Sequence, residues 1–349
     1  MSSTGAPQQD ENRATATETP TPARVTTPGG DAPAGSSTGA HPTAVETRRA
    51  VPGREIIAVG GGKGGIGKSL LASNMGVHLA QSGRRVVLID ADLGGANLHT
   101  FLGIKPPRLT LSDFVSHKIR DLEEVVTPTP IEGLGLISGA LDMLGAANPK
   151  YTQKLRLLRE VARLDVDTVI IDLGGGTSFN ILDFFLIADH GILTVVPEPT
   201  SIENAYRFIK AAYYRRLKTA EMSWNLRPLV EEAMNDVDGA GMRMPADLVT
   251  YVEQRDAEAG ARLRAELERF PLKLVVNQTR TEQEEKVGLA ISDACRKYFG
   301  IPMDFLGAIP FDDAVWQSVR RRRPVILEQP ESDASRSIVR ITGALGLVS

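Results

Sequence analysis

A glycine-rich segment at residues 60–69, Gly-Gly-Gly-Lys-Gly-Gly-Ile-Gly-Lys-Ser, is the strongest constraint on how this chain of 349 residues folds. An apolar run at 56–59 precedes it, and a helical pattern of apolar residues at 70–80 follows it. Residues 62–69 satisfy the pattern GxxxxGK[ST], in which glycines let backbone N–H groups turn inward around phosphates. The segment therefore predicts a strand, a phosphate-binding loop and a helix in succession.

The residue types in this loop have separate roles in nucleotide binding. Lys68 is expected to neutralise the β and γ phosphate oxygens, and the Ser69 hydroxyl is expected to ligate Mg²⁺. A helix that begins near Lys68 adds the positive end of its dipole. A glycine turn that only joins a strand to a helix would not need both side chains at these positions. The other loop residues expected to contact the nucleotide are Gly62, Lys63, Gly64, Gly65, Ile66 and Gly67.

Short β-branched runs alternate with helical patterns from residue 54 onward, which is typical of βα units. The runs at 56–59, 86–89 and 169–171 are continuously apolar, as buried central strands of a parallel sheet should be. We therefore expect an α/β, three-layer P-loop NTPase fold with a mostly parallel central sheet. The predicted strands are residues 55–59, 85–90, 134–137, 168–172, 191–196, 273–277 and 304–309.

Two segments depart from this rhythm. Of residues 1–53, 36 are Pro, Gly, Ser, Thr or Ala, and Leu, Ile, Phe, Tyr and Trp are missing, so we expect a disordered tail before the domain at 54–349. Residues 219–270 contain no convincing strand and predict an inserted pair of helices. One helix carries an apolar stripe between Leu226 and Val237; the other opens after Pro245, with the stripe Leu248, Val252, Ala259, Leu263 and Leu267.

An acidic residue follows the apolar run of the fourth predicted strand. Asp172 precedes Leu-Gly-Gly-Gly and is expected to hold Mg²⁺ through water. The amide of a glycine that follows can bond the γ-phosphate. The sequence leaves open whether Gly175 or Gly176 makes that contact.

The loop also contains a second lysine, Lys63, in the pattern KGGxGK[ST]. By this pattern the chain resembles the MinD/ParA family of dimerising ATPases. The resemblance implies ATP and Mg²⁺ as ligands, and it implies that Lys63 reaches across a homodimer interface to the phosphates of the neighbouring subunit. Hydrolysis would then require ATP-dependent dimerisation. The alternative is a solvated loop lysine.

The segment Asp90-Ala-Asp92 at the end of the second predicted strand extends the resemblance. In the family such a segment senses the γ-phosphate, which implies that Asp92 orients the attacking water. Asp90 is expected to support Mg²⁺ or its water shell. Acidic residues at a strand end can also be plain turn or helix caps, which is the alternative for both.

Later stretches bring the resemblance closer to the FlhG/FleN branch. Val195-Val-Pro-Glu-Pro-Thr-Ser201 is similar to a strand-to-helix turn of that branch, and nothing in residues 1–53 matches its N-terminal activator motif. The family uses an Asn at the position of Asn277 on the adenine edge, and residues 307–313, with Pro310, match the family loop that flanks the base, which favours ATP over GTP. A turn role for Asn277 stays open.

The remaining composition narrows the function. One cysteine, Cys295, allows no internal disulfide and indicates a reducing, cytoplasmic setting, and no run is long enough to cross a membrane. The end of the chain, 335–348, reads as the last helix of the fold, so no lipid anchor is expected. The run Arg320–Arg323 could bind DNA, but a solvated helix end is the commoner use of such a run.

We therefore expect an ATPase that acts as a dimerisation switch, a spatial or number regulator of a bacterial cellular structure, with a protein partner or activator at the insertion 219–270. The alternatives are a nucleotide-gated adaptor with negligible hydrolysis and a nonspecifically DNA-binding partition ATPase. Cluster carriers of the same fold need bridging cysteines, which this sequence lacks.

Overall fold

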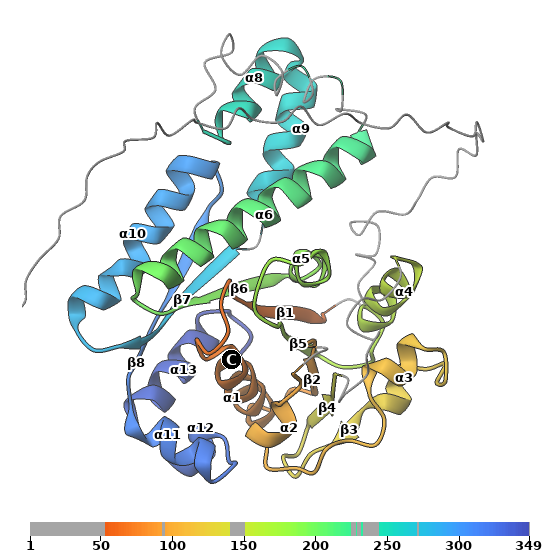
Figure 1. Ribbon diagram of the computed structural model, residues 1–349, viewed down its shortest axis with the longest axis vertical. Coiled ribbons are helices and arrows are strands. Elements are labelled where there is room, and N and C mark those ends of the chain that lie inside the picture. Colours follow the sequence, from red (N-terminus) through yellow and green to blue (C-terminus); the bar gives the residue numbers. More distant parts are fainter. Residues whose placement is uncertain are drawn as a thin grey trace, which may run out of the picture. The chain divides into compact units, whose positions relative to one another are not determined.

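The computed structural model describes residues 53–92, 95–139, 151–224, 228, 232, 244–270 and 272–348. These residues form one eight-stranded sheet in the order β3-β4-β2-β5-β1-β6-β7-β8, with helices on both faces (Figure 1). All neighbouring strands run parallel except β3, which is antiparallel to β4. The expected α/β fold with a mostly parallel sheet is confirmed.

The strands coincide closely with the apolar runs of the sequence. They are β1 (Glu55–Gly60), β2 (Val86–Asp90), β3 (Thr127–Pro128), β4 (Leu134–Ile137), β5 (Thr168–Asp172), β6 (His190–Val195), β7 (Leu272–Thr279) and β8 (Met303–Pro310). Every predicted strand is present, and two of them have the predicted bounds. The sequence did not predict β3, because two residues carry no periodicity.

Helices form the two outer layers. One face of the sheet is covered by α3 (Leu111–Val115), α4 (Tyr151–Val161), α5 (Phe179–Leu186), α6 (Pro199–Trp224) and α10 (Glu282–Phe299) (Figure 1). The other face is covered by α1 (Lys68–Gln81), α2 (Leu98–Phe101), α11 (Asp313–Arg320), α12 (Val325–Glu328) and α13 (Asp333–Gly343). No helix of the described residues has the length and apolar character needed to span a bilayer.

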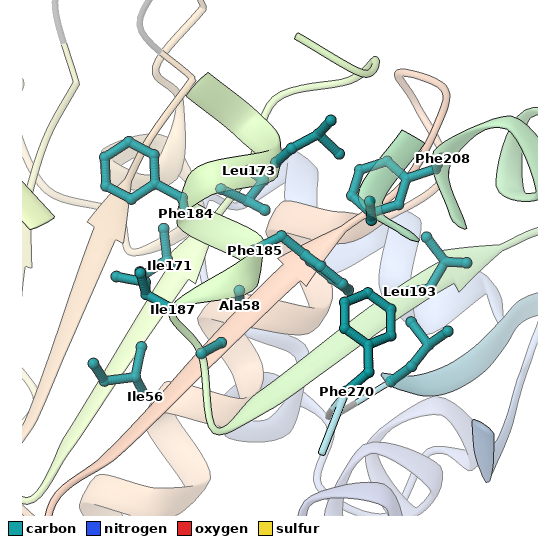
Figure 2. Close-up of a cluster of buried hydrophobic side chains, with 14 of the residues drawn as sticks. Ile56, Ala58, Ile171, Leu173, Phe184, Phe185, Ile187, Leu193, Phe208 and Phe270 are labelled. Carbon is teal, nitrogen blue, oxygen red and sulfur yellow. The ribbon is translucent and has the colours of Figure 1, made fainter. Parts of the chain in front are cut away.

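Alternation along the strands divides the core into two clusters. In β1, Ile56 and Ala58 face the α5–α6 side, whereas Ile57 and Val59 face α1. On the α5–α6 side, the Phe185 ring packs edge-on against Phe208 at 4.9 Å and also approaches Phe270 (Figure 2). A Cβ on Gly60 would lie 3.2 Å from both Phe185 and Phe208, so this aromatic group supports the strand end from which the glycine loop starts.

The predicted insertion is mainly helical where the structure describes it, with turns at 244–246 and 269. Its second part forms α8 (Asp247–Arg255) and α9 (Ala257–Glu268), and every residue of the predicted stripe from Leu248 to Leu267 is buried. One helix was expected here; two form because the Asp256 side chain accepts a hydrogen bond from the Ala259 amide and caps α9. The first predicted helix, with the stripe Leu226–Val237, lies almost entirely outside the described residues, as does the tail apart from Gly53.

A buried ion pair fastens α9 to the domain. Arg216 of α6 contacts Glu266 at 2.9 Å, and its Nε donates to the Glu266 carbonyl oxygen at 3.1 Å. Both side chains are buried. Because the apolar stripe of α8 and α9 is also buried, the helices present mostly charged side chains outward.

Candidate nucleotide site

The glycine loop joins the carboxyl end of β1 to the amino end of α1. Gly65 and Gly67 have φ values of 77° and 91°, a left-handed conformation that glycine adopts without steric cost. Lys68 opens α1, is buried, and donates from Nζ to the carbonyl oxygen of Lys63 at 3.0 Å. The loop therefore curls around its own lysine ammonium group, as a phosphate-binding loop does.

Two other backbone segments press against this loop. A Cβ on Gly62 would lie 2.4 Å from the carbonyl oxygen of Asn204 in α6. A Cβ on Gly175 would lie 2.9 Å from the amide nitrogen of Gly64, and the Gly176 amide donates to the Gly61 carbonyl. The glycines after Asp172 thus lie directly against the loop, and close contact between main chains explains why both segments are glycine.

Asp172 lies at the end of β5, buried beside α1. The Ser69 side chain forms a hydrogen bond with the Asp172 carboxyl group, whereas Oδ1 of Asp172 is buried without a hydrogen-bond partner among the described residues. Burial, together with the nearby charge of Asp90, raises the pKa of Asp172 to about 8. Burial also lowers the pKa of Lys68, although Asp172 and Asp92 oppose that shift.

These groups fit Mg²⁺. A hydroxyl and a carboxylate with an unpartnered buried oxygen are the oxygen donors that this cation prefers, and it commonly takes one or two protein ligands with substrate phosphates and water completing the shell. Within the described parts of the chain, no group of three or more His, Cys, Asp or Glu side chains could hold a metal by itself. The site therefore suits a metal that arrives with a phosphate ligand.

Asp90 has a different environment. One carboxylate oxygen accepts the amides of Asn97 at 2.7 Å and Leu98 at 2.9 Å, and the other accepts the amide of Asp92 at 3.2 Å. Burial raises its pKa to about 6, and the three donors oppose this rise. The geometry favours the turn-cap alternative for Asp90: it anchors the loop between β2 and α2.

Asp92 faces the glycines that follow Asp172. A Cβ on Gly174 would lie 3.3 Å from the Asp92 carboxyl group, and its charge acts on both Lys68 and Asp172. The structure thus brings Lys68, Asp92 and Asp172 to one end of the sheet, where the carboxyl ends of β1, β2 and β5 meet.

Lys63 points away from this group. Its side chain is 46% exposed, and its ammonium nitrogen lies 3.6 Å from Oε2 of Glu198, just before α6. Glu198 belongs to the Pro-Glu-Pro turn, but no local pattern pairs it with Lys63, because the contact exists only once β1 and β6 are neighbours.

A cavity of about 740 Å³ opens beside the loop at the ends of β7 and β8. Asn277 and Pro310, the two residues expected near the base, both line it. The Asn277 amide donates to the Ile66 carbonyl at 2.8 Å and accepts from the Gln278 amide at 2.9 Å, so it also ties β7 to the loop. Lining residues that the sequence did not single out are Leu70, Phe101, Val315, Trp316 and Val319.

The arginine run at the end of α11 is engaged within the chain. Arg321 and Arg323 both pair with Glu328, and the Arg320 guanidinium lies 4.7 Å from the Trp316 ring centroid. This arrangement accords with the solvated helix end. Cys295 is buried, and burial raises the pKa of its thiol to about 12, as expected for a residue used in packing.

The parallel sheet, the phosphate-binding loop and the acidic strand ends together define a P-loop NTPase of the α/β class. The chain belongs to the ParA family: the family model described as "ParA: NUBPL iron-transfer P-loop NTPase" matches residues 53–231.

Individual relatives agree with the expected branch. The chain is 26% identical over 284 residues to the antiactivator FleN of Pseudomonas aeruginosa, covering 80% of this chain and 82% of that protein. Its fold matches the septum site-determining protein MinD of Pyrococcus horikoshii, complexed with Mg-ADP, with a TM-score of 0.55 and 20% identity over 84% of this chain and 96% of that one. The MinC:MinD complex of Aquifex aeolicus matches with a TM-score of 0.54 and 20% identity, covering 84% and 97%. The resemblance to the MinD/ParA family and its FleN branch is confirmed.

Proposed function

We propose that this chain is an ATP-driven dimerisation switch that hydrolyses ATP slowly and regulates the position or number of a bacterial cellular structure. The similarity to FleN and to proteins named for septum-site determination supports this process class. The observation that carries the proposal is the placement of the two loop lysines, since Lys68 points into the loop and Lys63 points out of it.

The two positions suit two different phosphate groups. Lys68 is buried inside the loop and serves the nucleotide of its own subunit. Lys63 is half-exposed and held by a surface pair, and such a pair is worth only about 0–1 kcal/mol. A second subunit that brought its triphosphate to this surface would offer Lys63 a stronger anionic partner than Glu198. A cation delivered in this way acts like an arginine finger, worth on the order of 10³ to 10⁵ in rate in GTPases.

The other residues take the roles that their surroundings support. Ser69 and Asp172 would hold Mg²⁺, which when bound would supply positive charge to the phosphate oxygens. Asp92 orients the attacking water, and Lys68 stabilises charge on the γ-phosphate. An amide of Gly175 or Gly176 contacts the same phosphate. If Gly176 makes this contact, its amide must first break its hydrogen bond to the Gly61 carbonyl.

Dimerisation and hydrolysis test the proposal together. With Mg-ATP, Asp92→Ala is expected to accumulate as a dimer in light scattering, and Lys63→Ala is expected to lose phosphate release. Wild-type phosphate release per subunit should rise with protein concentration. Lys286→Ala, at an exposed lysine of α10, is the matched control and should behave as wild type.

Monomers of every variant in ATP, or a rate per subunit independent of concentration, would contradict the switch. Dimerisation on ATP without phosphate release would instead identify the nucleotide-gated adaptor.

The partner surface belongs to the same proposal. A stimulating protein is expected to contact the helices of the insertion, whose outward side chains are charged, such as Glu258, Arg262 and Arg264. DNA binding is the weaker alternative, because the strongest basic run of the sequence is paired with Glu328 and stacked on Trp316.

A further inference from the structure

The cavity beside the loop is bounded by the helix that follows the Asp90–Asp92 loop. Phe101, the last residue of α2, is half-buried and lines the cavity, as do Asn277 and Pro310 at the ends of β7 and β8. A ligand that fills the cavity therefore contacts α2.

The amino end of α2 is fixed to the acidic loop. The Asp90 carboxylate accepts the amides of Asn97 and Leu98 at the start of the helix and, through its other oxygen, the amide of Asp92. The side chain of Leu98 is fully buried in the α1 core. The main chain of Asp92 and the start of α2 are thus held by a single buried carboxylate, so a displacement of one is transmitted to the other.

The helix α11 also lines the cavity. Trp316 of α11 is 59% exposed and is one of the lining residues. Just beyond α2, a Cβ on Gly103 would lie 2.5 Å from the Arg322 carbonyl oxygen, and burial, together with the charge of Arg322, lowers the pKa of His99. The turn after α11 therefore rests against the residues that follow α2, and both helices contribute residues to the cavity lining.

We infer that α2 senses the nucleoside: a purine base in the cavity packs against Phe101, steadies α2, and through the Asp90 carboxylate sets the position of Asp92 at the phosphate end. Phe101 is then a positioning residue and Trp316 a binding wall. The inference rests on the proposed function, because it names what regulates that same site. It adds that triphosphate alone is an incomplete signal.

Adenosine and inorganic triphosphate separate the two ends of the site in the full-length protein. The readout is hydrogen exchange of the amides in residues 95–104, with adenosine binding followed by the fluorescence of Trp316 after Trp224→Phe. At adenosine ten times its dissociation constant, exchange of these amides should slow about tenfold if opening of α2 is incompatible with binding. Inorganic triphosphate should slow their exchange far less, because it does not contact Phe101.

Two variants, one in each helix that lines the cavity, make the test specific. In Phe101→Ala, adenosine should still quench the fluorescence of Trp316, but residues 95–104 should gain no protection from exchange. Trp316→Ala should need several-fold more adenosine, measured by calorimetry, yet gain full protection at saturation. Phe101→Leu, which keeps an apolar side chain, should restore protection. A merely structural role for Phe101 would change exchange equally with and without adenosine.

The outcomes separate this inference from the proposed function. The coupling is wrong if adenosine fails to bind, or if it binds and leaves residues 95–104 unprotected. The proposed switch still holds in that case if the chain hydrolyses ATP and dimerises. If adenosine protects α2 in a chain that neither dimerises nor releases phosphate, the coupling between nucleoside binding and α2 is supported, and the proposed dimerisation switch is contradicted.

Discussion

The two ends of the site differ in what forms them: main chain at the phosphate end and side chains at the base end. At the phosphate end, main chains lie so close together that Gly62 and Gly175 leave no room for a Cβ. At the base end, side chains from α2, β8 and α11 form the walls, and Phe311 and Trp316 are half-exposed. The phosphate end therefore has little tolerance for change, whereas the base end can adjust to a ligand or to a substitution.

The largest effect is expected at Gly62, in the tightly packed phosphate end. Gly62→Ala places a methyl group 2.4 Å from the Asn204 carbonyl oxygen, so the loop or α6 must move. We expect Mg-ATP affinity to fall by about 100-fold, the equivalent of roughly 3 kcal/mol of strain. Gly343→Ala, in α13 and away from the loop, where nothing lies within 4 Å, is the control and should bind normally by calorimetry. Equal affinities for the two variants would show that the phosphate end is not tightly packed.

The anchor of the acidic loop should matter for stability. Asp90→Ala leaves the buried amide of Leu98, and those of Asp92 and Asn97, without their acceptor. We expect the free energy of unfolding to fall by about 1–3 kcal/mol, measured by urea denaturation. Asp113→Ala, which removes a partly exposed cap in α3, should cost less. An unchanged stability of Asp90→Ala would argue against its role as an anchor.

A smaller effect is expected at the base end. Trp316→Ala removes one wall while the strand ends remain, so ATP affinity should fall about three- to tenfold, the worth of one aromatic contact. Leu289→Ala, at an exposed apolar residue of α10, is the control and should leave affinity unchanged. A loss as large as that of Gly62→Ala would mean that the base end is as rigid as the phosphate end.

The smallest effect concerns the surface pair that holds Lys63. Glu198→Gln removes an interaction worth about 0–1 kcal/mol, so phosphate release should rise by no more than about fivefold, with stability unchanged. Glu203→Gln, which breaks the exposed pair with Arg207, is the control. A fall in rate would show that Glu198 assists Lys63 and does not restrain it.

The same contrast explains what the sequence could predict. The residues of the phosphate end lie within one short motif or directly after apolar strands, so spacing alone located Lys68, Ser69 and Asp172. The stripe from Leu248 to Leu267 was also readable, because helical periodicity repeats within a few residues.

The walls of the base end could not be predicted in this way. Phe101 and Trp316 belong to short helices far apart in the chain and become neighbours only through the order of the strands. The contact between Lys63 and Glu198, and the engagement of Asn277 with the glycine loop, likewise depend on pairing between distant strands. Local residue patterns therefore cannot predict such contacts.

Mixing Lys63→Ala with Asp92→Ala tests the central claim most directly. Each variant alone is expected to be inactive, but a mixed dimer contains one complete site, in which the Asp92→Ala subunit supplies Lys63 to a partner that retains Asp92. With random pairing, an equimolar mixture should release phosphate at about a quarter of the wild-type rate. A mixture no faster than the sum of its two components would contradict the account.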